Sequence, residues 1–97
     1  MSQQQRPAPE EDLAILRAEI DEADRALVAI LATRRAIVER IRALKAAHGL
    51  ARIDRAREEA VRRGLETERA RLGVPVALLD AVLAAVLEDS RALVTRP

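Results

Sequence analysis

Two basic side chains fall within an apolar helical stripe, which is where the sequence points most directly to chemistry. In "LATRRAIVERIRALK", residues 31–45, Leu31, Val38 and Ile41 recur at helical spacing, and Arg34 and Lys45 occupy the same row. The two cations are about three helical turns apart, so both side chains face one side of the helix. A stripe of the kind that faces a core therefore carries two positive charges.

A third cation and a carboxylate belong to the same grouping. Arg57 and Glu58 lie one turn before Val61, which marks the apolar side of a second helix. Because unpaired buried charges are costly, the grouping favours an anionic guest, and the arginine fork and the lysine point charge both suit carboxylates. We expect a small dicarboxylate. A purely structural reading, in which each long stem packs on the stripe and its head reaches water, stays open at this point.

Helices are the only regular elements that the sequence pattern predicts. Pro7 and Pro9 are expected to keep the first ten residues out of a helix, which leaves residues 1–11 as a flexible tail. The first helix is expected to start near Asp12 and to run for about 36 residues, to a loop in "HGLARID" that begins near Gly49. Its stripe contains Leu13, Leu16, Ile20, Ala23, Leu27, Leu31, Arg34, Val38, Ile41 and Leu44.

Two shorter helices are predicted to follow. Asp54 is a candidate N-cap for the second, Gly73 can close it, and Pro75 can open the third. One face of the third helix carries Val76, Leu79, Leu83, Val86, Ser90 and Val94. The predicted fold class is therefore all-α, with residues 12–97 forming a single helical domain.

The length of the first helix predicts a second copy of the chain. About 36 helical residues extend about 54 Å, whereas a compact chain of this size has a radius of gyration of about 13 Å. Much of the stripe would therefore be left in water. An intertwined homodimer, in which two long helices share one core, removes that exposure.

Composition argues against several classes of partner and cofactor. Seventeen basic and sixteen acidic side chains give a net charge of +1, and aromatic residues are absent, so nucleic acid is not expected. No cysteine is present and His48 is the single histidine, so no metal site is expected. The sequence shows no apolar signal region and no run long enough to span a bilayer. We expect a cytoplasmic protein that does not bind membranes.

Three segments together resemble the all-helical chorismate mutases. They are "LRAEIDEADRALVAILATRRAIVERIRALK", "DRAREEAVRR" and "VLEDSRALV", in matching order and spacing from Leu16 to Val94. The resemblance implies a homodimer with two shared active sites, each converting chorismate to prephenate in phenylalanine and tyrosine biosynthesis. It implies no cofactor.

The resemblance also implies roles for the cations. Arg17, which would reach into the partner's site, and Arg34 would hold the two substrate carboxylates, with Arg57 supporting them. Lys45 would donate to the ether oxygen. Such a pericyclic rearrangement needs no nucleophile or general base, because holding the compact conformer and stabilising charge on the ether oxygen are sufficient help.

The remaining positions of the family pattern are polar, with one departure. Asp54 and Glu58 would address the substrate hydroxyl, and Ser90 matches a polar position. One turn later the family usually has Gln or Glu, which supplies a second hydrogen bond to the ether oxygen, and this sequence has Val94. Substitutes for that donor are poor: Thr95 is one residue off the face, and Arg91 or Arg96 would need a bent or frayed terminus.

Three consequences of the departure remain open: weak mutase activity, a partner enzyme of the same pathway that remodels the C-terminal turn and activates the enzyme, or a chorismate relative as substrate. Isochorismate pyruvate-lyase and aminodeoxychorismate mutase would use the same cations on the same fold. A non-catalytic helical dimerisation module would explain the stripe, although it would gain nothing from three cations in one seam.

Overall fold

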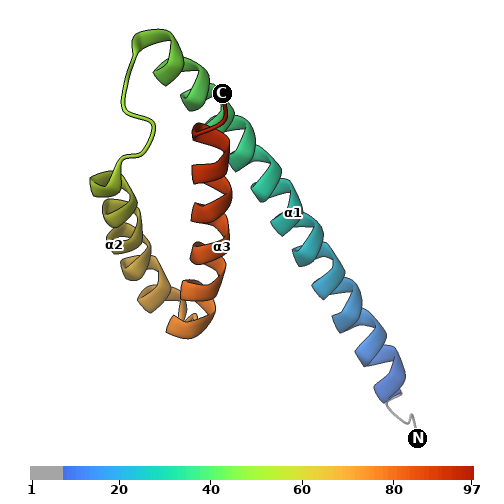
Figure 1. Ribbon diagram of the computed structural model, residues 1–97. Coiled ribbons are helices and arrows are strands. Elements are labelled where there is room, and N and C mark those ends of the chain that lie inside the picture. The colour runs from blue at the N-terminus through green and yellow to red at the C-terminus, as the bar shows by residue number, and fades with distance from the viewer. Residues whose placement is uncertain (1–7) are drawn as a thin grey trace, which may run out of the picture. The chain divides into compact units, whose positions relative to one another are not determined.

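The described part of the chain is all-helical, as the sequence predicts. The computed structural model describes residues 8–97 and contains α1 (Pro9–His48), α2 (Arg55–Leu72) and α3 (Val76–Val94), with no strand in that range (Figure 1). None of the described helices is long and apolar enough to cross a membrane.

The first helix starts earlier than the sequence analysis expects. Pro9 is its first residue, so the prediction that Pro9 stays outside the helix is wrong. Proline is tolerated there because the first helical N–H groups have no intrahelical partner in any case. The acidic residues Glu10, Glu11 and Asp12 occupy the first turn, where the helix dipole favours negative charge. Residues 1–7 of the expected tail lie outside the described residues.

The boundaries predicted at Asp54, Gly73 and Gly49 are confirmed. The Asp54 side chain accepts a hydrogen bond from the backbone N–H of Arg57 at 2.9 Å and so caps α2. Gly73 ends α2 with φ 73°, and its N–H donates to the backbone oxygen of Arg69. Gly49, after α1, has φ 63°. Both glycines hold the left-handed conformation that side chains with a Cβ rarely adopt.

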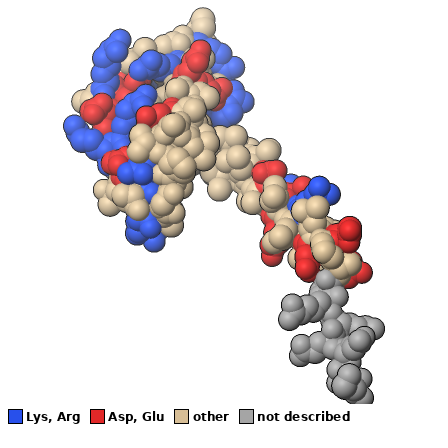
Figure 2. Space-filling model, turned by 90° about the horizontal axis from the view of Figure 1, so that it is seen from below, with Lys and Arg blue, Asp and Glu red and all other residues tan. Residues whose placement is uncertain are grey.

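The chain divides into two compact units, Met1–Arg34 and Arg35–Pro97, called here the N-terminal and C-terminal units. The described part of the N-terminal unit, residues 8–34, is helical from Pro9. Figure 2 shows acidic side chains gathered over the first turns of α1. Its predicted apolar row is exposed: Leu13, Leu16, Ile20 and Leu27 keep between 45% and 58% of their surface. The expectation of a single domain over residues 12–97 stays a prediction.

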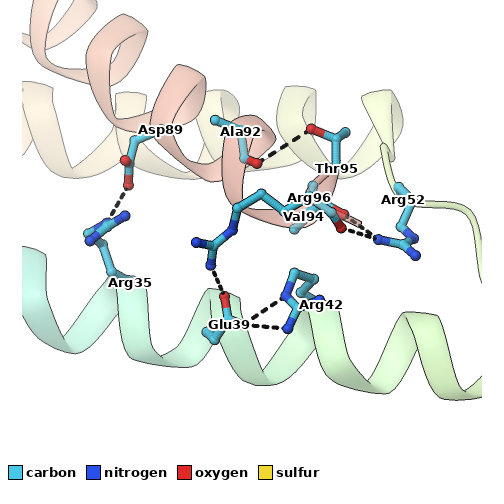
Figure 3. Close-up of polar contacts among 9 residues, drawn as sticks. All are labelled: Arg35, Glu39, Arg42, Arg52, Asp89, Ala92, Val94, Thr95 and Arg96. Carbon is cyan, nitrogen blue, oxygen red and sulfur yellow. Dashed lines mark hydrogen bonds and ion pairs between the residues drawn. The ribbon is translucent and has the colours of Figure 1, made fainter.

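The C-terminal unit contains the end of α1 together with α2 and α3. Helices α2 and α3 pack side by side and run in opposite directions (Figure 1). Val38 of α1 forms a buried cluster with Leu93 and Val94 at the end of α3. Ion pairs border this cluster, where Arg35 binds Asp89 at 2.9 Å and Arg96 binds Glu39 at 2.8 Å (Figure 3).

Candidate functional site

The end of α1, the loop of residues 49–54 and the end of α3 are joined by hydrogen bonds in the C-terminal unit. The ammonium group of Lys45 donates to the backbone oxygen of Arg52 at 3.1 Å. The guanidinium group of Arg52 in turn donates to the backbone oxygens of Val94 and Arg96, at 3.0 and 3.1 Å (Figure 3). Two of the predicted site residues, Lys45 and Val94, are thus linked through one loop residue that the sequence analysis did not select.

The start of α2 carries three further predicted site residues. Asp54 and Arg57 are exposed, and Glu58 is half-buried. Asp54 uses one carboxylate oxygen for the cap, and an ionised carboxylate has further acceptor capacity for a substrate hydroxyl. The cap therefore leaves Asp54 able to act as both a structural and a binding residue.

Glu58 is bound by Arg91 of α3. Arg91 Nε donates to Glu58 Oε1 at 2.8 Å, and Arg91 Nη2 contacts Glu58 Oε2, so the pair is two-pronged. This hydrogen bonding by Arg91 is the main reason that the pKa of Glu58 lies below its usual value, and the positive charges of Arg55 and Arg62 act in the same direction. Glu58 is accordingly an anion whose charge is already balanced by a neighbour.

The pair of Glu58 and Arg91 could not be predicted from the sequence. The sequence points to Arg91 only as a substitute donor beside Val94, because nothing local connects positions 58 and 91. The pair forms because the start of α2 packs against the end of α3, and only the tertiary structure reveals this packing.

Each of the three substitute donors at the C-terminal turn already has a partner within the C-terminal unit. Arg91 is engaged by Glu58, and Arg96 by Glu39. The Thr95 hydroxyl donates to the backbone oxygen of Arg91 at 2.7 Å. Helix α3 continues through Val94 and is capped at Thr95, and Arg96 lies beyond the helix.

The two predicted site residues of α3 differ in their surroundings. Ser90 is half-buried, and its hydroxyl donates to the backbone oxygen of Val86 at 3.0 Å. Val94 keeps 9% of its surface exposed and packs with Val38 and Leu93. Its role beside a substrate remains a prediction, and an apolar side chain supplies no hydrogen bond there.

The other two predicted cations belong to the N-terminal unit. Arg17 is exposed and Arg34 is half-buried. The grouping of these two arginines with Lys45, Arg57 and Glu58 into one site stays a prediction.

The loop end of the C-terminal unit, defined here as Lys45, Arg52, Asp54, Glu58 and Arg91, combines cations with carboxylates. Such a set can bind an anionic, hydroxylated small molecule by charge and hydrogen bonding. Among the described residues, no group of three or more histidine, aspartate or glutamate side chains is placed to hold a metal ion.

Comparison with known proteins gives one match. Residues 16–95 match the family model described as chorismate mutase type II. No curated protein and no solved structure matches the chain.

Proposed function

The chain belongs to the chorismate mutase type II family, and on that premise we propose that it rearranges chorismate to prephenate in the phenylalanine and tyrosine branch of aromatic biosynthesis. The observation that carries the proposal is the loop end. There Lys45 is held by the loop backbone, while Asp54 caps α2 and Glu58 lies in its first turn. These are the residue types that the reaction requires, at the positions where the family pattern has them.

The chemistry needs positioning and charge stabilisation only. One C–O bond breaks and one C–C bond forms within a single molecule, with no proton lost or gained overall. Lys45 donates to the ether oxygen as negative charge develops on it, which stabilises the transition state more than the ground state. Asp54 and Glu58 accept from the ring hydroxyl and so help to hold the reactive conformer.

The two substrate carboxylates require the arginines. Arg34 and Arg17 bind them, with Arg17 supplied by a second chain and Arg57 supporting the pair. The exposed apolar row of the N-terminal unit supports a homodimer, because contiguous exposed apolar surface favours association. In that assembly each site takes residues from both chains.

Val94 bears on how active the enzyme is when alone. Since Val94 offers no hydrogen-bond donor, Lys45 is the donor on which the ether oxygen depends. The rate of the rearrangement without a partner enzyme is therefore low. The activating partner enzyme expected from the sequence stays a prediction, and a pull-down with the purified chain as bait tests it.

Incubation of the purified protein with chorismate, with products identified by mass spectrometry, tests the proposal. Formation of prephenate supports it. Release of pyruvate from isochorismate identifies a lyase, and turnover restricted to aminodeoxychorismate identifies the related mutase. No turnover of any of these substrates by a folded dimer identifies a dimerisation module and overturns the proposal. The absence of Trp, Tyr and Phe keeps the protein's own ultraviolet background low.

A further inference from the structure

We propose that Arg91 sets the substrate preference of the site, by keeping Glu58 paired so that the site favours a neutral ring hydroxyl over a ring ammonium group. This inference rests on the proposed function, because it assumes that Glu58 faces the ring substituent. It assigns a role to a residue outside the family-derived site set.

The geometry of the pair leaves Glu58 able to accept from a hydroxyl. Arg91 approaches both carboxylate oxygens with two nitrogens of its fork. An ionised carboxylate has about four acceptor positions, and the fork occupies about two of them. The Glu58 side chain is 19% exposed, so part of it remains accessible beside the fork. A substrate O–H can therefore bind without displacing Arg91.

The charge balance around Glu58 disfavours an added cation. Arg91 binds the carboxylate directly, and Arg55 and Arg62 are close enough to lower its pKa as well. An ammonium group on the substrate would be attracted to the carboxylates of Asp54 and Glu58 and repelled by these three guanidinium groups. A hydroxyl carries no net charge, so the cations exert no comparable repulsion on it.

The preference for a hydroxyl over an ammonium group is measured by comparing two substrates. The ratio of kcat/KM for chorismate to kcat/KM for aminodeoxychorismate is determined near neutral pH for the wild-type protein and for Arg91→Met. We expect the ratio to shift about tenfold toward the ammonium-bearing compound in Arg91→Met, because the variant removes the only one of these cations that binds the Glu58 carboxylate directly. Arg91→Lys keeps the cation and should keep most of the preference. Arg71→Met, which breaks the exposed pair with Glu68 on the same helix as Glu58, is the matched control and should leave the ratio unchanged.

A second variant covers the case in which Arg91→Met does not fold. Glu58→Gln removes the anion and leaves the cation, so its ratio should move in the opposite direction, toward chorismate. Unchanged ratios in a folded Arg91→Met or Glu58→Gln protein overturn the inference while leaving chorismate mutase activity in place. Failure of the wild-type protein to convert chorismate overturns the proposed function instead.

Discussion

Arg52 donates to the backbone oxygen of Val94 at 3.0 Å, and the same nitrogen donates to that of Arg96 at 3.1 Å. The last carbonyl groups of a helix lack intrahelical partners, and a loop side chain here supplies donors at the end of α3. Because the backbone oxygen of Arg52 also accepts from Lys45, the position of the Lys45 ammonium group is tied to the order of the C-terminal turn.

Arg52→Met should loosen the end of α3. The variant loses two charge-assisted hydrogen bonds, one of them exposed, and we expect a loss of about 1 kcal/mol in unfolding free energy. For a domain of this size that corresponds to a fall of about 4–8 °C in Tm, measured by far-ultraviolet circular dichroism. Arg63→Met, at an exposed position of α2, is the control. Equal Tm values for the two variants would show that the Arg52 bonds contribute nothing to stability.

Mixing two inactive variants should restore activity if sites are shared between chains. Arg17→Ala and Arg34→Ala chains, co-refolded in equal amounts, give heterodimers in which one of two sites has both arginines. With random pairing, about a quarter of wild-type turnover should return. Recovery no greater than that of either variant alone, or a monomeric mass by light scattering, removes the shared-site model.

Lys45→Met should lower turnover strongly while changing the stability of the fold only slightly. Turnover should fall by at least about 100-fold, because the donor to the ether oxygen is lost. The Tm should change by only a few degrees, since a half-buried cation is replaced by an apolar side chain of similar length. Arg40→Met, at an exposed position of α1, should leave turnover unchanged. A large fall in Tm with chorismate binding retained would assign Lys45 a structural role.

Val94→Gln should raise kcat by at least about tenfold, since an amide at this position can donate to the ether oxygen in the transition state. The position is buried, so the same change should also lower Tm. Val94→Leu alters size without adding a donor and is the control. If Gln gives no gain over Leu in proteins of equal helicity, Val94 does not leave the ether oxygen short of a donor.

Acid should weaken the contact between α1 and the C-terminal turn through Glu39. Hydrogen bonding by Arg42, followed by Arg96, lowers the pKa of Glu39 below its usual 4.5. The folded state thus binds fewer protons at this group than the unfolded state does. The stabilisation is present above about pH 4.5 and is lost as pH falls through the lowered pKa.

In Glu39→Gln, the Tm deficit relative to wild type should be largest near neutral pH and should shrink as the pH falls below about 4.5. Glu59→Gln, at an exposed position of α2, is the control. A deficit of constant size across this range would contradict the assignment.

Local sequence signals predicted the helices well. Asp54, Gly49 and Gly73 each mark a boundary because capping and positive φ depend on one or two adjacent residues. Pro9 misled the prediction because proline is excluded from helix interiors and accepted at the first helical position, and the sequence alone did not distinguish the two.

The polar contacts of the site could not be predicted in the same way. Arg52 and Arg91 each bind groups that lie more than thirty positions away along the chain. No periodicity connects such positions, and arginine is frequent in this sequence, so residue type alone does not select these two from the others. Only the packing of α3 beside α2 and the end of α1 identifies their partners.

The exposed row of Leu13, Leu16, Ile20 and Leu27 has a further consequence in the proposed homodimer. A twofold axis repeats every residue, so one codon change in this row alters the shared core at two places. A truncation in this row therefore weakens the association of the two chains as well as their folding, whereas a truncation in the core of a single chain acts on folding first.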